Sequence, residues 1–194
     1  KIRNAVILII ISWYNFQMSK PRISFMFPAH NEEDNIVPSV EIASKVMEDV
    51  ASEYEIIVVD DVSVDKTAII VDNLALTNPH VRAYHHEKNL GYGDALWTGI
   101  QKARYDWFFF TDSDLQFDIN EIRKLLSYIS DYKIVLGYRA PRKDPFMRIL
   151  NGKGWNILVR MLFGLKVRDI DCAFKLIDRK ILASLPLKTR GATT

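Results

Sequence analysis

Short apolar runs alternate along this chain with segments whose apolar residues recur at helical spacing, and this alternation constrains the fold most. Runs rich in β-branched and aromatic residues predict strands at 22–27, 54–60, 81–86, 107–112 and 133–138. Helical spacing predicts helices at 35–50, 66–76, 93–103, 120–130 and 146–163. The run WFFF at 107–110 lacks polar alternation, so that strand requires cover on both faces. The sequence therefore predicts an α/β fold with a mostly parallel sheet flanked by helices.

The composition fits one globular domain with a full apolar core. The chain has 194 residues, of which 48% are hydrophobic and 26% are charged. Its net charge of +2 is too small to indicate a nucleic-acid partner, so we expect none. The single cysteine, Cys172, excludes an internal disulfide and fits a reducing compartment. We expect it to be a small buried apolar residue.

The first 17 residues differ from the rest of the chain. Lys1 and Arg3 flank the start of a strongly apolar stretch, and no charge occurs from Asn4 through Ser19. The apolar part is shorter than the about 20 residues that a spanning helix needs, and no small-residue cleavage site follows it. We interpret residues 1–17 as a leader, a membrane-surface anchor or translated upstream sequence. Residues 18–194 form the predicted domain.

Polar segments follow four of the predicted strands. They read PAHNEED, DDVSVDKT, NLGYGDAL and DSDLQ in chain order. Because ligands bind beyond the carboxyl ends of parallel strands, we expect these segments to meet at one rim of the sheet. The sequence thus predicts a binding site there, built partly from acids.

The acids at this rim indicate a cation. Asp60, Asp61, Asp112 and Asp114 would repel one another unless a positive charge lay among them. Carboxylates together with the amide oxygen of Gln116 suit Mg²⁺ or Mn²⁺ better than zinc. Since such ions commonly bridge phosphates, a nucleotide diphosphate is the expected ligand.

Other residues near the rim give weaker signals. Gly91 and Gly93 precede a predicted helix and would let the backbone approach a phosphate, or form an ordinary turn. The neighbouring His85 and His86 should point to opposite faces of their strand, which argues against joint metal binding. Asp65 is the predicted N-cap of the helix at 66–76.

Six motifs occurring in order resemble glycosyltransferase family 2, and within it the polyprenyl-phosphate (dolichyl-phosphate) mannose and glucose synthases. The resemblance covers about residues 21–190 and rests on FPAHNEEDNI, VVDDVSVDKT, NLGYGDALWTGI, TDSDLQFD, GYR and RDIDCAFKLI. It implies a GT-A fold, a Rossmann-related arrangement, and a nucleotide-sugar donor of the UDP-glucose or GDP-mannose class. It also implies Mg²⁺ or Mn²⁺ as cofactor.

The resemblance assigns roles position by position. It implies metal ligation by Asp114 and Gln116, and catalytic roles for Asp169, Arg139 and Asp112. The residues it implies for donor binding are Pro28, His30, Glu32, Val59, Asp61, Asp112, Ser113, Asp114 and Arg139.

This sequence departs from the family pattern at three places. His30 stands where the family usually has tyrosine. Val62 replaces the glycine of the DDGS motif, and a β-branched residue is strained there if that position has a positive φ. The chain also ends at KTRGATT, where the family continues, so we interpret the sequence as incomplete at its C-terminus.

The implied reaction is an inverting transfer of a hexose from the nucleotide sugar to a polyprenyl phosphate. A phosphate monoester is largely dianionic at pH 7 and is already a nucleophile. We therefore expect cations to matter more than a general base, with Arg139, Lys175 and either Arg142 or Lys143 as candidates. The basic, aromatic-bearing stretch at 142–168 predicts contact with a membrane surface, with core packing as the other explanation of its apolar residues. We therefore expect the protein to lie at the cytoplasmic face of a membrane.

Two other functions are compatible with these residues. A soluble family-2 enzyme would glycosylate a hydroxyl of a polysaccharide or protein, and it would need a general base. A non-catalytic module would bind the nucleotide sugar without transferring it. Val62 in place of glycine and the early end of the chain allow this second alternative.

Overall fold

The computed structural model describes residues 20–138, 154–155, 161–162, 169 and 171–184. Its strands are β1 (Arg22–Ala29), β2 (Glu53–Asp60), β3 (Val81–His85), β4 (Trp107–Thr111), β5 (Ile134–Leu136) and β6 (Phe174–Asp178). Its helices are α2 (Ile36–Val50), α3 (Thr67–Thr77), α4 (Tyr92–Lys102), the 3₁₀ helix η1 (Ile119–Glu121), α5 (Ile122–Leu126) and α7 (Arg179–Ser184). Strands and helices alternate through β4, as the sequence predicts.

The strands form one sheet in the order β3-β2-β1-β4-β6-β5. β3, β2, β1 and β4 run parallel, whereas β6 is antiparallel to both β4 and β5. The sequence did not indicate β6, which lies between β4 and β5 in the sheet. Phe174 pairs with Thr111, so β6 begins at the same rim where β4 ends.

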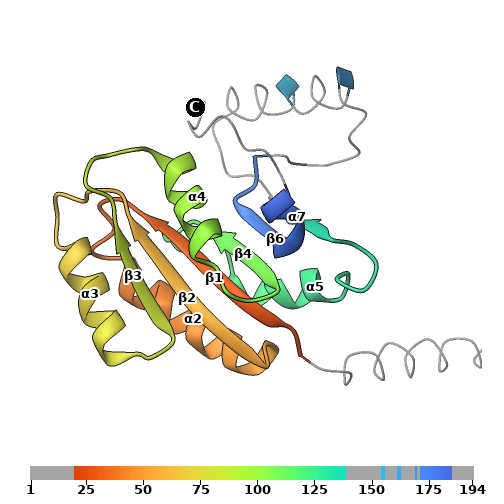
Figure 1. The fold of residues 1–194 in the computed structure, drawn as a ribbon, viewed down its shortest axis with the longest axis horizontal. Helices are drawn as coiled ribbons and strands as arrows, with labels where there is room; N and C mark the ends of the chain where they lie inside the picture. The colour runs from red at the N-terminus through yellow and green to blue at the C-terminus, as the bar shows by residue number, and fades with distance from the viewer. Residues whose placement is uncertain (1–19, 139–153, 156–160, 163–168, 170, 185–194) are drawn as a thin grey trace, which may run out of the picture.

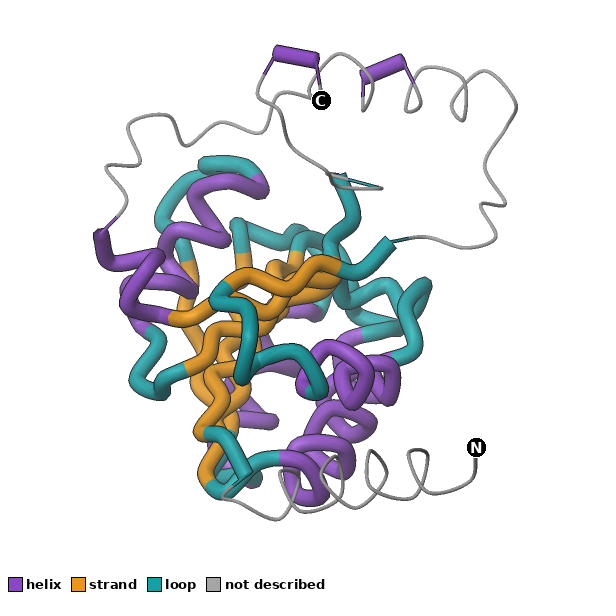
Figure 2. The backbone as a smooth tube through the Cα atoms, turned by 90° about the vertical axis from the view of Figure 1, so that its right-hand side faces the viewer, coloured by secondary structure: helices purple, strands orange, loops and turns teal. Residues whose placement is uncertain are grey.

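Helices cover both faces of the sheet (Figures 1 and 2). α2, α3, η1 and α5 contribute buried or packed residues to one apolar core, and α4 and α7 contribute to a second core on the other face. The prediction that the strand at 107–112 is buried on both faces is confirmed. Phe109 packs in the first core, whereas Phe108 and Phe110 pack in the second.

Aromatic stacking and one close helix contact hold the central strands. Phe109 lies edge-on to Phe25 at 4.7 Å and to Phe174 at 4.8 Å between ring centroids, which ties β4 to β1 and β6. On the other face, a Cβ at Gly99 would lie 2.6 Å from the Cγ of Met26. Only glycine lets α4 approach β1 so closely without displacing Met26. This contact sets the position of α4, whose N-terminus lies at the rim.

Several boundaries differ from the predicted ones. The helix expected at 120–130 is a 3₁₀ turn followed by α5, which ends at Leu126. The N-cap of α3 is Lys66 and not Asp65. The Asp65 carboxylate, one position earlier, still accepts a hydrogen bond from the Thr67 N–H at 2.9 Å, which is the bond to the second following residue that a capping side chain makes.

Two predictions concern residues outside the described part of the chain. The interpretation of residues 1–17 lies wholly outside it, and so does most of the helix expected at 146–163 and of the basic stretch at 142–168. Within those segments only 154–155 and 161–162 are described, and both pairs are helical. Among the described residues, no helix combines the length and apolarity needed to cross a membrane.

Candidate active site

A cleft of about 360 Å³ opens at the rim where β1, β2, β3 and β4 end. All four polar segments reach it, which confirms that they meet at one rim. Its lining residues are Pro28, Ala29, His30, Glu32, Asp61, Asn89, Gly91, Tyr92, Ala95, Asp112, Ser113 and Asp114. The topology therefore brings together side chains up to 86 positions apart, from Pro28 to Asp114.

The loops after β1 and β2 interlock beside this cleft. The Asn31 N–H donates to the Ser63 hydroxyl at 2.9 Å, and the Val64 N–H donates to Asn31 Oδ1 at 2.8 Å. The Glu32 N–H donates to the Thr67 hydroxyl at 2.8 Å. Asn31 has a φ of +59°, a conformation that asparagine tolerates. These reciprocal bonds fix the two loops as one unit.

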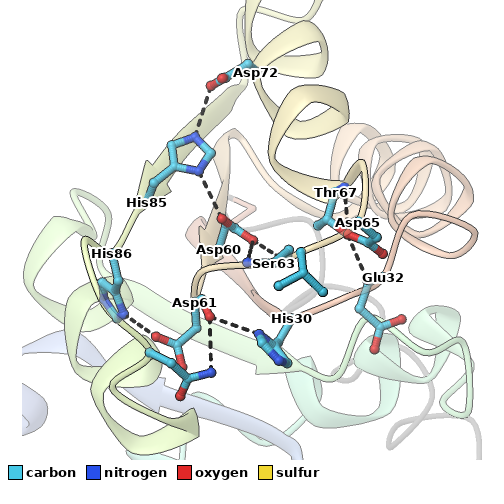
Figure 3. A network of polar contacts seen from close by, with 12 residues as sticks. His30, Glu32, Asp60, Asp61, Ser63, Asp65, Thr67, Asp72, His85 and His86 are labelled. Atoms are coloured by element: carbon cyan, nitrogen blue, oxygen red, sulfur yellow. Dashed lines mark hydrogen bonds and ion pairs between the residues drawn. The ribbon is translucent and has the colours of Figure 1, made fainter.

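His30 is exposed in the cleft with its ring orientation fixed (Figure 3). Its Nδ1 lies 2.9 Å from the carbonyl oxygen of Asp61, and its Nε2 lies 3.2 Å from Asn31 Nδ2. A carbonyl only accepts, so Nδ1 carries the proton and Nε2 accepts from the Asn31 amide. The geometry thus selects one neutral tautomer.

Asp60 and Asp61 turn toward different partners (Figure 3). Asp60 is 2% exposed, and its carboxylate lies 3.2 Å from His85 Nδ1 and accepts the Ser63 N–H at 3.2 Å. His85 Nε2 lies 3.0 Å from Asp72 on α3. Although burial works against the charged ring, the hydrogen bonds to Asp60 and Asp72 raise the pKa of His85. The expected four-acid cluster around one cation is therefore wrong, because Asp60 faces α3 and has its own partners.

Asp61 points the other way, toward the segment that follows β3. Its carboxylate accepts the N–H groups of Leu90 at 2.9 Å and of Gly91 at 2.7 Å, and it lies 2.7 Å from His86 Nδ1. Burial works to raise the pKa of Asp61, but these bonds from Leu90, His86 and Gly91 outweigh it and lower the pKa. His86 and His85 thus pair with different acids on opposite faces, as their adjacency predicted.

Val62 follows these acids with a φ of +59°. The condition under which valine would be strained at this position, a positive φ, is therefore met. The left-handed conformation brings the Cβ close to the following carbonyl oxygen, and a β-branched side chain makes this contact worse. Val62 is therefore strained in the loop that carries Asp61.

Two hydrogen bonds of Ser113 hold the segment after β4 in place. The buried Ser113 donates its hydroxyl to the carbonyl oxygen of Pro28 at 3.1 Å, and its own carbonyl accepts the Ser39 hydroxyl at 2.8 Å. These two bonds tie the loop to β1 and α2, so that Asp112 and Asp114 on either side of Ser113 line the cleft.

Tyr92 contacts the first of these acids. Its hydroxyl donates to Asp112 Oδ1 at 3.1 Å. Burial, followed by the charges of Asp112 and Asp114, raises the pKa of Tyr92, so the phenol stays protonated and remains a donor.

The acids of the cleft fit a divalent cation that is shared with a ligand. Asp112 and Asp114 offer the carboxylate oxygens that Mg²⁺ and Mn²⁺ prefer. Within the described part of the chain, no group of three or more histidine, cysteine and acidic side chains could hold a metal. Magnesium sites commonly combine one or two carboxylates with water and ligand oxygens.

Sequence comparison identifies the family. The pattern described as Glycosyl transferase family 2 matches residues 24–185, which is most of the chain. The chain belongs to glycosyl transferase family 2. The resemblance carried by the six motifs is thereby confirmed.

Two curated relatives show which branch of family 2 the chain is similar to. A dolichyl-phosphate beta-glucosyltransferase from Trichomonas vaginalis is 32% identical over 183 residues, covering 85% of this chain and 54% of that protein. An undecaprenyl-phosphate 4-deoxy-4-formamido-L-arabinose transferase from Pectobacterium atrosepticum is 31% identical, covering 84% of this chain and 50% of that protein. The chain thus spans about half the length of these relatives.

Solved structures share the fold. Mannosyl-3-phosphoglycerate synthase from Rubrobacter xylanophilus matches with a TM-score of 0.66 and 20% identity, over 85% of this chain and 55% of that one. Glucosyl-3-phosphoglycerate synthase from Mycobacterium tuberculosis, solved with UDP, matches with a TM-score of 0.64 and 24% identity, over 85% and 59%. A mannosyltransferase from Pyrobaculum calidifontis, solved with GDP-Man and Mn²⁺, matches with a TM-score of 0.65 and 18% identity. The match covers 90% of this chain and 53% of that one. The expected GT-A fold of family 2 is confirmed.

The structure brings seven of the nine residues expected to bind the donor of this family-2 protein to the cleft. They are Pro28, His30, Glu32, Asp61, Asp112, Ser113 and Asp114. The side chain of Val59 is instead fully buried in the core beneath α4. Arg139 lies outside the described residues, as do Arg142 and Lys143.

The remaining candidates lie away from the cleft lining. Gln116 lines a separate pocket of about 720 Å³ beside α5 and β5 and is not among the residues that line the cleft. Its backbone N–H donates to Asp114 Oδ1 at 3.1 Å. Asp169 is 5% exposed, and Cys172 is buried as expected. Burial lowers the pKa of Lys175 on β6, although Cys172, Asp171 and Asp169 oppose this shift.

The sequence did not single out Tyr92 and Asn89 as cleft residues, nor His86 as the partner of Asp61. All three lie between the end of β3 and the first residue of α4, where the sequence indicated only the glycines and the opposed directions of His85 and His86. Gly91 has a φ of +87° and directly precedes α4, whereas Gly93 lies inside the helix. The sequence does carry one signal for Tyr92: it directly follows Gly91, the glycine that precedes α4 at the rim. The first residue of a helix that begins there lies beside the cleft.

Proposed function

We propose that this chain is the donor-binding part of an inverting family-2 glycosyltransferase that moves a hexose from a nucleotide-diphosphate sugar to a polyprenyl phosphate. The observation that carries the proposal is the cleft in which four strand-end loops converge on Asp112 and Asp114. The names of the relatives support a polyprenyl-phosphate acceptor, since they are dolichyl-phosphate and undecaprenyl-phosphate sugar transferases.

The donor would enter the cleft with its diphosphate toward Asp112 and Asp114. These carboxylates would hold Mg²⁺ or Mn²⁺, which would supply positive charge to the departing diphosphate. The rest of the lining would bind the nucleoside part of the donor. It includes Pro28, Glu32, Asp61 and the neutral ring of His30. The donor is a UDP-glucose or GDP-mannose type of sugar nucleotide.

The acceptor side needs positive charge more than a base. A polyprenyl phosphate would arrive largely dianionic at pH 7, so no proton has to leave its attacking oxygen. Lys175 is one cation on the acceptor side: it lies one residue into β6 from the rim, with its ammonium 5.8 Å from the Phe110 ring centroid. Arg139 is the second proposed cation, and Asp169 is the proposed active-site carboxylate.

Membrane contact is the remaining part of the proposal. Trp155, Met161 and Leu162 are large apolar residues that are 52%, 78% and 67% exposed. They belong to a stretch with basic residues interleaved, a composition that favours the surface of an anionic membrane. We propose that the protein works at the cytoplasmic face of a membrane, where a lipid-linked acceptor is reached.

Metal-dependent donor binding tests the proposal. UDP-glucose and GDP-mannose are titrated calorimetrically into wild-type protein and Asp114→Asn, with Mn²⁺ or with chelator. We expect wild type to bind one donor at least tenfold more tightly with Mn²⁺ and Asp114→Asn to lose that gain, since a carboxylate ligand is removed. Asp131→Asn, an exposed acid remote from the cleft lining, is the control. Equal affinity under all conditions would overturn the metal assignment.

A further inference from the structure

Tyr92 lines the cleft, but the family motifs assign it no role. It is the first residue of α4 and lines the cleft with 38% of its surface exposed. Its hydroxyl reaches across the rim from the segment after β3 to Asp112, which follows β4. Tyr92 therefore joins two strand-end segments at the acid expected to face the diphosphate.

The backbone that carries Tyr92 is held in place on both sides. Before it, the Gly91 N–H donates to the buried carboxylate of Asp61 at 2.7 Å. After it, the N–H groups of Asp94 and Ala95 donate to the Gly91 carbonyl at 3.1 Å, which closes the first helical turn. The close contact of Gly99 with Met26 sets the depth of α4 on the sheet. The phenol is thus presented to Asp112 by a fixed helix end.

The hydrogen bond has a direction that suits a positioning role. An ionised carboxylate only accepts, so the Tyr92 hydroxyl is the donor and Asp112 Oδ1 the acceptor. A hydrogen bond to a charged group is stronger and more directional than a neutral one. It restricts the rotation of the Asp112 carboxylate before any ligand enters.

We propose that Tyr92 is a positioning residue of the donor site, which orients the Asp112 carboxylate and thereby sets the affinity of the cleft for the diphosphate and its cation. This inference rests on the proposed function, because it assumes that a nucleotide diphosphate occupies the cleft. It predicts that removal of the Tyr92 hydroxyl weakens the binding of ligands that carry a diphosphate and leaves the binding of monophosphates unchanged. If the ring acted only by packing, its loss would change the affinity for every ligand of the cleft, or for none.

Tyr92→Phe removes the hydroxyl and keeps the ring, so it isolates the hydrogen bond. UDP and GDP, and separately UMP and GMP, are titrated calorimetrically into wild type and variant with Mn²⁺. We expect the affinity for the bound diphosphate to fall about tenfold, as the loss of a hydrogen bond to a charged group predicts. The affinity for the monophosphate, which lacks the second phosphate, should stay within about twofold of wild type. Tyr132→Phe, at a 59% exposed position outside the cleft, is the matched control and should change neither.

The outcomes separate this inference from the function on which it rests. If wild type binds a diphosphate with Mn²⁺ and Tyr92→Phe binds it equally well, the inference is overturned and the proposed function stands. Equal weakening of diphosphate and monophosphate would also overturn it, because Tyr92 would then act through the shape of the cleft. If wild type binds neither diphosphate, both the proposed function and the inference fail. Thermal unfolding of both variants, with a melting temperature near that of wild type, verifies that each is folded.

Discussion

Val62 shows at the scale of one residue how this site departs from its family pattern. Its φ of +59° puts a β-branched side chain where glycine is the usual residue. The left-handed conformation costs about 1–2 kcal/mol for residues with a Cβ. A side chain branched at Cβ, such as valine, crowds the neighbouring backbone further. The loop keeps this conformation because Asp60, Asp61 and Ser63 on either side are hydrogen-bonded. The strain is present before any ligand binds.

The substitution Val62→Gly should therefore stabilise the folded protein. We expect the free energy of unfolding to rise by up to about 1 kcal/mol, because relief of the strain outweighs the larger backbone entropy of glycine in the unfolded chain. For a chain of this size the melting temperature should rise by about 2–4 °C. Val64→Gly is the matched control: Val64 is 89% exposed and is not among the residues with positive φ. It should lower the melting temperature or leave it unchanged, and an equal rise in both variants would contradict the strain.

The pairing of single side chains could not be predicted from the sequence. The alternation of neighbours along a strand correctly separated His85 from His86. It could not show that Asp60 and Asp61 separate in the same way, because these acids lie at the end of a buried strand and find their partners in β3 and in the segment between β3 and α4. The sequence therefore suggested one acidic cluster, where the structure has two histidine–aspartate pairs and a separate pair of acids after β4.

At the scale of elements, the segment between β3 and α4 depends on one carboxylate. Asp61 accepts from Leu90 and Gly91, and both bonds fall at the point where the chain turns into α4. The lowered pKa of Asp61 means that its ionised form stabilises the fold. This stabilisation is present above the ordinary pKa of 3.8 and is lost as the pH falls through the lower folded-state value.

Asp61→Asn should accordingly lower the free energy of unfolding and make it depend less on pH. The amide cannot accept as well from two N–H groups, so we expect a loss of about 1–3 kcal/mol at pH 7. That difference should shrink below about pH 4, where wild type also begins to lose its carboxylate. Urea unfolding followed by tryptophan fluorescence from pH 7 to pH 2.5 measures both effects. Asp49→Asn, which changes an exposed acid paired with Arg123 at 2.8 Å, is the control, and a constant difference across pH for Asp61→Asn would contradict the assignment.

The elements themselves were predictable where burial leaves a clear pattern. Strands β1, β2 and β4 are apolar because both of their faces are covered, and α2 shows one apolar stripe. β6 was missed because Lys175 and Asp178 interrupt a five-residue run that also resembles a functional motif. α5 is shorter than its pattern suggests, since its apolar residues continue into turns that pack on the same core.

At the scale of the whole molecule, the order of the strands creates the site. β1 lies between β2 and β4, so the acids after β2 and β4 flank the segment after β1 in one cleft. The alternation of elements predicted this rim, and the six motifs predicted the family. The position of the acceptor could not be derived in the same way. Its expected residues come from β6 and from segments far along the chain, whose spatial relation to β4 depends on an antiparallel pairing without a local signal.

The last prediction concerns the reaction of the whole enzyme and the nature of its acceptor. If the acceptor is a phosphate, no essential proton has to be removed, and Asp169→Asn should retain measurable transfer to a polyprenyl phosphate. Arg139→Ala should cost more, about 2–5 kcal/mol, because the role we propose for Arg139 is to compensate negative charge where donor and acceptor meet. A family-2 enzyme that uses a sugar or protein hydroxyl predicts the reverse order, since general-base help is worth about 10²- to 10⁴-fold. Initial rates of both variants at saturating Mn²⁺, from pH 6 to pH 9, distinguish the two. An inactive Asp169→Asn beside an Arg139→Ala that keeps most of its activity would mean that the attacking group is a hydroxyl.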